Sequence, residues 1–174
     1  ARQRGYGETG RRLFFKEECV EKLSFGEGVF DAVVAHLVYR DLEQRPAALR
    51  EMHRVLAPGG RLLLTTPLRG SYVEVFDMLR ERARAEGDDV LAARVRSLVE
   101  RDPAPTPLVQ ALEAAGFIAV NLERIDFRLS FASADALFSD RLLGAIAFPE
   151  WQATVGPEAL DDVRRRLATY FDQG

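Results

Sequence analysis

The stretch FDAVVAHLVYRDLEQRPAALREMHRVLAPGGRLLLTTP, residues 30–67, holds two strand signals on either side of a helix signal. Residues 32–37 and 61–66 are short apolar runs without alternation, a pattern typical of strands that are covered on both faces. Between them, apolar residues recur at helical spacing, namely Leu49, Met52, Val55 and Leu56. The run Pro58-Gly59-Gly60 then ends the helix. The stretch therefore predicts a βαβ unit.

The same residues carry a resemblance to a protein family. FDAVV followed by ALREMHRVLAPGGRLLLTTP resembles strand four, the next helix and strand five of class I S-adenosylmethionine-dependent methyltransferases, in the subgroup that acts mostly on small molecules. That family has an acidic residue before strand four and an E-x-x-R-V-L-x-P-G-G run before strand five. The matching residues here are Asp31, Glu51, Arg54, Val55, Leu56, Pro58, Gly59 and Gly60. The resemblance implies an α/β, Rossmann-like fold whose mostly parallel sheet ends in an antiparallel strand pair.

The resemblance covers only the C-terminal two-thirds of the family's domain. Residues 11–18 look like strand three, whereas the Gly-rich cofactor loop and the N-terminal strands one and two are absent from this sequence. Those two strands lie between strands three and four in the family's sheet, so one edge of strand four would lack its partner. Three explanations stay open: residues upstream of Ala1, which we favour, a second chain that fills the gap, or a displaced strand three.

A glycine pattern near the N-terminus resembles a nucleotide-binding turn. Gly5, Gly7 and Gly10 spell G-x-G-x-x-G. No apolar strand precedes them, and the β-like run Leu13-Phe14-Phe15 follows where a helix should begin. We therefore predict a plain loop there.

Composition bounds the classes of function. With 174 residues, of which 47% are hydrophobic, the chain predicts one domain, residues 1–174, and the resemblance implies a helical insert at about 68–107. The net charge of −3 gives no electrostatic case for nucleic acid or an anionic membrane. One cysteine and two histidines predict neither a disulfide nor a metal site. Without a signal-peptide core or a long apolar run, we expect a cytoplasmic protein that spans no membrane.

The resemblance implies S-adenosylmethionine as cofactor and indicates where it would bind. In the family, an acidic residue after strand three usually accepts a hydrogen bond from the adenine amine. Aligning residues 23–25 with the end of that pattern places Cys19 at the acidic position, directly after Glu18. A thiol is a poor acceptor, so the contact would need Glu18 to reach in, and a solvated charge run is the alternative. The candidate cofactor contacts are Glu18, Cys19, Val20, Ala35 and His36.

The substrate would meet the cofactor beyond strand four, because ligands of open α/β sheets bind outside the carboxyl ends of strands. His36 has the chemistry of a general base near neutral pH, although a structural histidine is the favoured interpretation. Methyl transfer depends mainly on alignment, so no residue is assigned as catalytic. The candidate substrate contacts are Tyr39, Arg40, Arg69 and Tyr72.

Periodicity predicts the remaining elements. We expect amphipathic helices within residues 73–80, 90–99 and 108–115, and an alternating antiparallel strand pair at 117–123 and 125–131. A helix capped by Ser133 should run through Leu143. A loop is expected at 148–151 and a last helix at 157–171.

Together these features predict S-adenosylmethionine-dependent methyl transfer to a small-molecule substrate. The alternative is a catalytically inactive methyltransferase-like domain that acts in protein interaction, by binding a partner or a second copy through the strand-four edge. A third, weaker hypothesis is a split enzyme whose missing half is another chain.

Overall fold

A computed structural model describes residues 15–126 and 128–172. The chain divides into two compact units. The strand unit consists of the described part of Ala1–Thr65 with Ala111–Ile118, and the helical unit consists of the described parts of Thr66–Gln110 and Ala119–Gly174. A two-stranded parallel sheet with accompanying helices confirms the α/β class.

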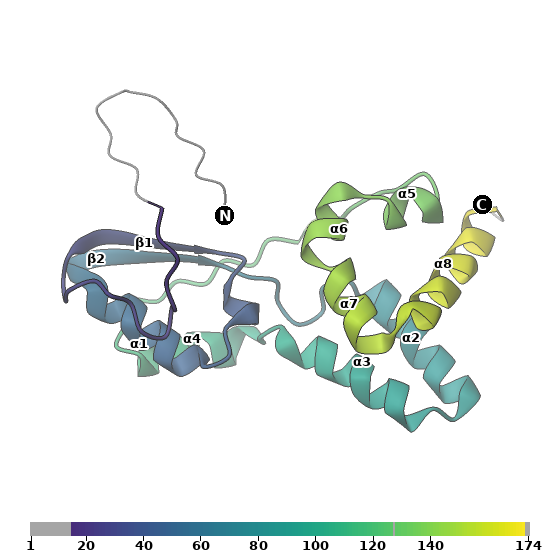
Figure 1. Ribbon diagram of the computed structural model, residues 1–174, viewed down its shortest axis with the longest axis horizontal. Coiled ribbons are helices and arrows are strands. Elements are labelled where there is room, and N and C mark those ends of the chain that lie inside the picture. Colours follow the sequence, from purple (N-terminus) through teal and green to yellow (C-terminus); the bar gives the residue numbers. More distant parts are fainter. Residues whose placement is uncertain (1–14, 127, 173–174) are drawn as a thin grey trace. The chain divides into compact units, whose positions relative to one another are not determined.

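The predicted βαβ unit is confirmed in the strand unit (Figure 1). β1 (Phe30–His36) and β2 (Leu56–Thr65) pair in parallel, and α1 (Arg45–Val55) connects them after the short 3-10 helix η1 (Tyr39–Asp41). The apolar stripe of α1 is buried, comprising Ala48, Leu49, Met52 and Val55. Burying this stripe removes apolar surface from water and so holds the crossover in place.

The Pro-Gly-Gly run lies inside β2 as an irregularity of the strand. Phe30 pairs with Leu56, but Ala32 pairs with Arg61, so residues 57–60 are accommodated opposite a single residue of β1. A Cβ on Gly60 would lie 2.9 Å from the carbonyl oxygen of Ala57 and 3.1 Å from that of Phe30. This close approach of backbone requires glycine. The strand consequently begins at Leu56, five residues earlier than predicted.

One face of the strand pair is open in the described part of the chain. Val34 and Leu63 face each other in register and are 71% and 55% exposed, whereas Ala35 is buried. Successive side chains of a strand point to opposite faces, so alternate residues are covered. The prediction that these strands are covered on both faces is therefore wrong for the structure described.

The helical unit has its own core around Trp151. Its elements are α2 (Val73–Glu86), α3 (Asp89–Arg101), α5 (Ala134–Phe138), α6 (Arg141–Ile146), α7 (Phe148–Val155) and α8 (Pro157–Asp172). The Trp151 side chain is 1% exposed, and its ring makes edge contacts with Tyr72, Phe76 and Phe148 at centroid distances of 5.0, 5.3 and 5.4 Å. These aromatic contacts join α7 to α2 and to the segment before it.

The predicted antiparallel strand pair is not found. After α4 (Pro105–Ala114), residues 117–126 and 128–131 contain neither helix nor strand, and the expected strand three is absent from residues 15–18. Ile118 and Ile125 are 91% and 73% exposed. Alternation favours a strand only where a neighbouring strand supplies hydrogen bonds and a surface to cover. Residues 1–14, with the GYGETG loop and the start of the expected strand three, lie outside the described residues.

The C-terminal helices differ from the prediction in their boundaries. Ser133 caps α5 as expected, because its hydroxyl accepts a hydrogen bond of 3.0 Å from the amide of Ala136. The carboxylate of Asp140 then accepts from the amides of Leu142 and Leu143, which starts α6 and splits the predicted helix in two. The expected loop at 148–151 is the start of α7, with Pro149 in its first turn.

Replacing Trp151 with alanine should lower the free energy of unfolding by about 3–5 kcal/mol, because it removes a buried aromatic side chain and leaves a cavity. Urea denaturation measures this. Tyr170→Ala is the matched control, because Tyr170 is 73% exposed and its loss should change stability by about 0.5 kcal/mol or less. Equal effects of the two substitutions would contradict the assignment of this core.

Candidate active site

The carboxyl ends of β1 and β2 lie side by side. His36 pairs with Thr65 in register, and His36 Nδ1 shares a hydrogen bond of 2.6 Å with Thr65 Oγ1. The amide of Leu37 donates to the carbonyl oxygen of Thr65 at 2.9 Å, and the backbone of Leu37 is left-handed, with φ 57°. This conformation is unfavourable for a branched residue and turns the chain sharply after β1. His36 therefore presents an exposed imidazole at the carboxyl end of β1. Open α/β sheets bind ligands at this edge.

Tyr39 and Arg40, predicted to face the substrate, are buried after this turn, at 4% and 6% exposure. The guanidinium of Arg45 lies over the ring of Tyr39, 5.0 Å from its centroid, and also donates to the carbonyl oxygen of Arg40 at 3.0 Å. Burial raises the pKa of the Tyr39 phenol, and the charge of Arg45 opposes this rise. Both side chains are therefore packed into the interior of the segment that follows β1.

Glu18 lies near the start of the described segment that precedes β1. It accepts hydrogen bonds from the amide and the hydroxyl of Ser24, at 3.0 and 2.6 Å, and forms an ion pair with Lys16. The hydrogen bond from Lys16, followed by those from Ser24, lowers the pKa of Glu18 to about 2. A carboxylate has about four acceptor positions, so three partners leave one available. Glu18 is therefore suited to accept one further N–H donor.

Cys19 cannot supply that acceptor. Its exposed thiol donates to Glu21 Oε2 at 3.1 Å, which lowers the pKa of Glu21. The carbonyl oxygen of Cys19 accepts from the amide of Lys22 in a tight turn, and Val20 inside this turn is half-buried. Among the predicted cofactor contacts in this turn, Glu18 is the one with carboxylate chemistry.

A clamp formed by Glu51 and Arg54 of α1 holds the segment between this turn and β1. Arg54 donates to both carboxylate oxygens of Glu51 at 2.8 Å, and Glu51 accepts from the amide of Leu23 at 2.9 Å. Arg54 also donates to the carbonyl oxygens of Leu23 and Phe25, at 3.2 and 3.0 Å. The site predicted from the sequence does not include these two residues, although the E-x-x-R spacing places both on one face of a helix.

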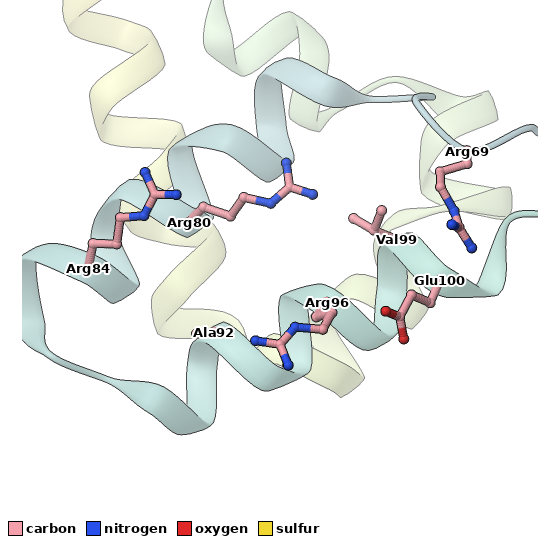
Figure 2. A pocket seen from close by; sticks show the side chains of 7 residues that line it. All are labelled: Arg69, Arg80, Arg84, Ala92, Arg96, Val99 and Glu100. Carbon is pink, nitrogen blue, oxygen red and sulfur yellow. The ribbon is translucent and has the colours of Figure 1, made fainter. Parts of the chain in front are cut away.

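The structure distributes the predicted site residues over both units. Glu18, Cys19, Val20, Ala35, His36, Tyr39 and Arg40 belong to the strand unit, whereas Arg69 and Tyr72 belong to the helical unit. Tyr72 precedes α2 with a left-handed backbone and packs on Trp151, and Arg69 lines a pocket beside α2 and α3 (Figure 2). Within residues 15–126 and 128–172, no group of three potential metal ligands is present. None of the helices described there is long and apolar enough to span a membrane.

Comparison with known proteins supports a methyltransferase relationship. The family model described as "Methyltransferase domain" matches residues 1–64. A demethylmenaquinone methyltransferase of Thermus thermophilus is 32% identical over 127 residues, covering 68% of this chain and 57% of the relative. A ubiquinone/menaquinone biosynthesis C-methyltransferase of Bradyrhizobium is 33% identical over 128 residues, covering 66% of this chain and 49% of the relative. These matches confirm the resemblance seen in the sequence.

The extent of these matches is limited. A demethylmenaquinone methyltransferase of Mycobacterium tuberculosis is 42% identical over 65 residues, which is 36% of this chain and 28% of the relative. The chain thus spans less than two thirds of these curated relatives. No solved structure matches the chain significantly.

Replacing Glu51 with glutamine should lower the melting temperature near neutral pH. Arg54 holds the pKa of Glu51 at about 2, below its ordinary 4.5, so the carboxylate stabilises the fold fully above pH 4.5. That contribution is lost as the pH falls from 4.5 through about 2, and the wild-type and variant curves should converge there. Glu113→Gln, which alters an exposed glutamate of the same unit, is the control. A temperature difference independent of pH would contradict the clamp.

Proposed function

We propose that this chain, whose residues 1–64 match a methyltransferase domain, is part of an enzyme that transfers a methyl group from S-adenosylmethionine to a small molecule. The matched residues include β1, α1 and nearly all of β2. The observation that carries the proposal is that the carboxyl ends of the two strands meet at His36 and Thr65. This edge is the ligand-binding edge of open α/β folds. Demethylmenaquinone, named in the relatives, is the first acceptor to assay.

The fold belonging to this proposal is a Rossmann-like, mostly parallel sheet in which β1 and β2 are strands four and five. The bare edge of β1 and the exposed side chains of Val34 and Leu63 would then be covered by further strands and helices. Residues of about 68–107, which contain α2 and α3, would be a helical insert within one methyltransferase-like domain. A parallel pair with one open face favours such a larger assembly.

The proposed cofactor contacts divide by chemistry. The remaining acceptor position of Glu18 suits the adenine amine, with Cys19 and Val20 in the same turn. Ala35 and His36, at the end of β1, would contact the methionine portion. S-adenosylmethionine, when bound, supplies the methyl group from a sulfonium. The proposed substrate contacts are Tyr39 and Arg40 in the strand unit and Arg69 and Tyr72 in the helical unit. Alignment would supply most of the catalysis.

A second candidate function is protein interaction without methyl transfer. The outer edge of β1, which is unpaired in the described part of the chain, favours it, because a partner strand could add there. A partner that also covers the adjoining open face would bury Val34 and Leu63. A split enzyme, whose missing half is another chain, would use the same edge. Cofactor binding separates the two classes, since an interaction domain needs no S-adenosylmethionine.

S-adenosylhomocysteine should bind the complete protein saturably in a calorimetric titration. Glu18→Ala should weaken that binding by about tenfold, because it removes a charged hydrogen-bond acceptor. Ser24→Ala is the matched control, since it loosens the same turn but keeps the carboxylate. It should weaken binding much less.

Two results would contradict these assignments. Absence of saturable binding would overturn the enzyme proposal. Equal weakening by Glu18→Ala and Ser24→Ala would show that the shape of the turn matters and that Glu18 makes no direct contact.

A further inference from the structure

Four arginines surround one open pocket of the helical unit (Figure 2). Arg80 and Arg84 come from α2, Arg96 comes from α3, and Arg69 comes from the segment before α2. The pocket has a volume of about 410 Å³. This concentration of positive charge stands out because the whole chain carries a net charge of −3.

The spacing of these arginines destabilises the fold by charge repulsion unless a negative charge lies nearby. Arg80 and Arg84 are four residues apart on one helix, where like charges destabilise the helix. Arg96 adds a third guanidinium from the facing helix α3. Clustered guanidinium groups are stabilised most effectively by an anion that neutralises several of them at once.

Acidic residues of the protein compensate this charge only in part. Arg80 forms an ion pair with Asp77 at 2.6 Å. Among the described residues, Arg69, Arg84 and Arg96 form no ion pair, and Glu100 is the acidic residue that lines the pocket. By contrast, the neighbouring Arg82 points elsewhere, to Glu86 and to the carbonyl oxygen of Glu158. The arginines that line the pocket therefore keep donors available.

The walls of the pocket also suit a ligand. Half-buried Ala92 and Val99 of α3 provide an apolar surface between the charged side chains. Such a surface lowers the local dielectric and strengthens charge interactions. The amide of Arg69 donates to the carbonyl oxygen of Pro103 at 3.0 Å, which fixes the segment carrying that arginine against the residues that follow α3.

We propose that this pocket binds a small, multiply charged anion of the phosphate type. The planar fork of arginine matches phosphate oxygens in a bidentate manner, and guanidinium groups on two helices can contact different oxygens of one ligand. The pocket lies wholly in the helical unit, depends on no residue of β1 or β2, and shares Arg69 with the proposed substrate contacts. Variants at Arg84 and Arg96 therefore test it separately from methyl transfer.

Inorganic pyrophosphate is the probe for this site. Calorimetric titration of the complete protein should show saturable binding that weakens as salt is added. Arg84→Gln and Arg96→Gln should each reduce the affinity by about tenfold, corresponding to the loss of a charged hydrogen bond. Arg96→Lys, which keeps the charge but loses the fork, should give an intermediate affinity.

Arg94→Gln is the matched control, because Arg94 is an exposed arginine of the same helix that does not line the pocket. The affinity of the Arg94→Gln variant for pyrophosphate should equal that of the wild type. An unchanged circular dichroism spectrum should verify that each variant is folded. A wild-type protein that binds no pyrophosphate would overturn the proposal. An Arg94→Gln variant that loses as much affinity as Arg96→Gln would overturn it too, since binding would then follow overall charge.

A second arm distinguishes the sources of the phosphate group. Vesicles of phosphatidylglycerol, with phosphatidylcholine vesicles as the uncharged control, present the same group at a lipid surface. If the wild type binds pyrophosphate but not these vesicles, the ligand is a soluble phosphate compound. If it also binds the vesicles, and Arg96→Gln abolishes that binding, the site also accepts a lipid headgroup.

Discussion

The parallel pairing of β1 with β2 is the constraint on which the strand unit depends. Parallel strands need a crossover, and α1 supplies it while burying its apolar stripe. The same pairing brings His36 next to Thr65, so the candidate site results from strand register. Because α1 covers one face and leaves Val34 and Leu63 exposed on the other, the pair has the surface of a sheet that continues.

The two units achieve order by different means. In the strand unit, charged hydrogen bonds from Glu51 and Arg54 attach an irregular segment to a helix, and Glu18 organises the turn before that segment. In the helical unit, aromatic packing around Trp151 holds the helices, which leaves the outer faces of α2 and α3 available for arginine. Polar contacts thus shape the candidate cofactor site, whereas apolar packing supports the arginine pocket.

The sequence predicted helices and strands well where hydrophobic periodicity and glycine or proline signals agree. The helix before Pro58-Gly59-Gly60 and the last helix after Pro157 were both found, because periodic apolar residues mark them, although the first ends at Val55 and the glycine run lies inside β2. The strand pair at 117–131 was not found, because alternation describes one strand while pairing needs two. The clamp was missed as part of the site because its partners, Leu23 and Phe25, contribute backbone groups, which residue identity does not reveal.

The run from Glu51 to Gly60 made the family recognisable, and the structure gives four of its residues a folding role. Glu51 and Arg54 hold a neighbouring segment, Val55 is buried, and Gly60 allows two carbonyl oxygens to approach. None of these roles involves a transferred group. A descendant that had lost all chemistry would be under the same pressure to keep the run. The presence of this run is therefore evidence of common ancestry and correct folding. Whether a protein that carries it is an active enzyme must be judged from residues at other positions.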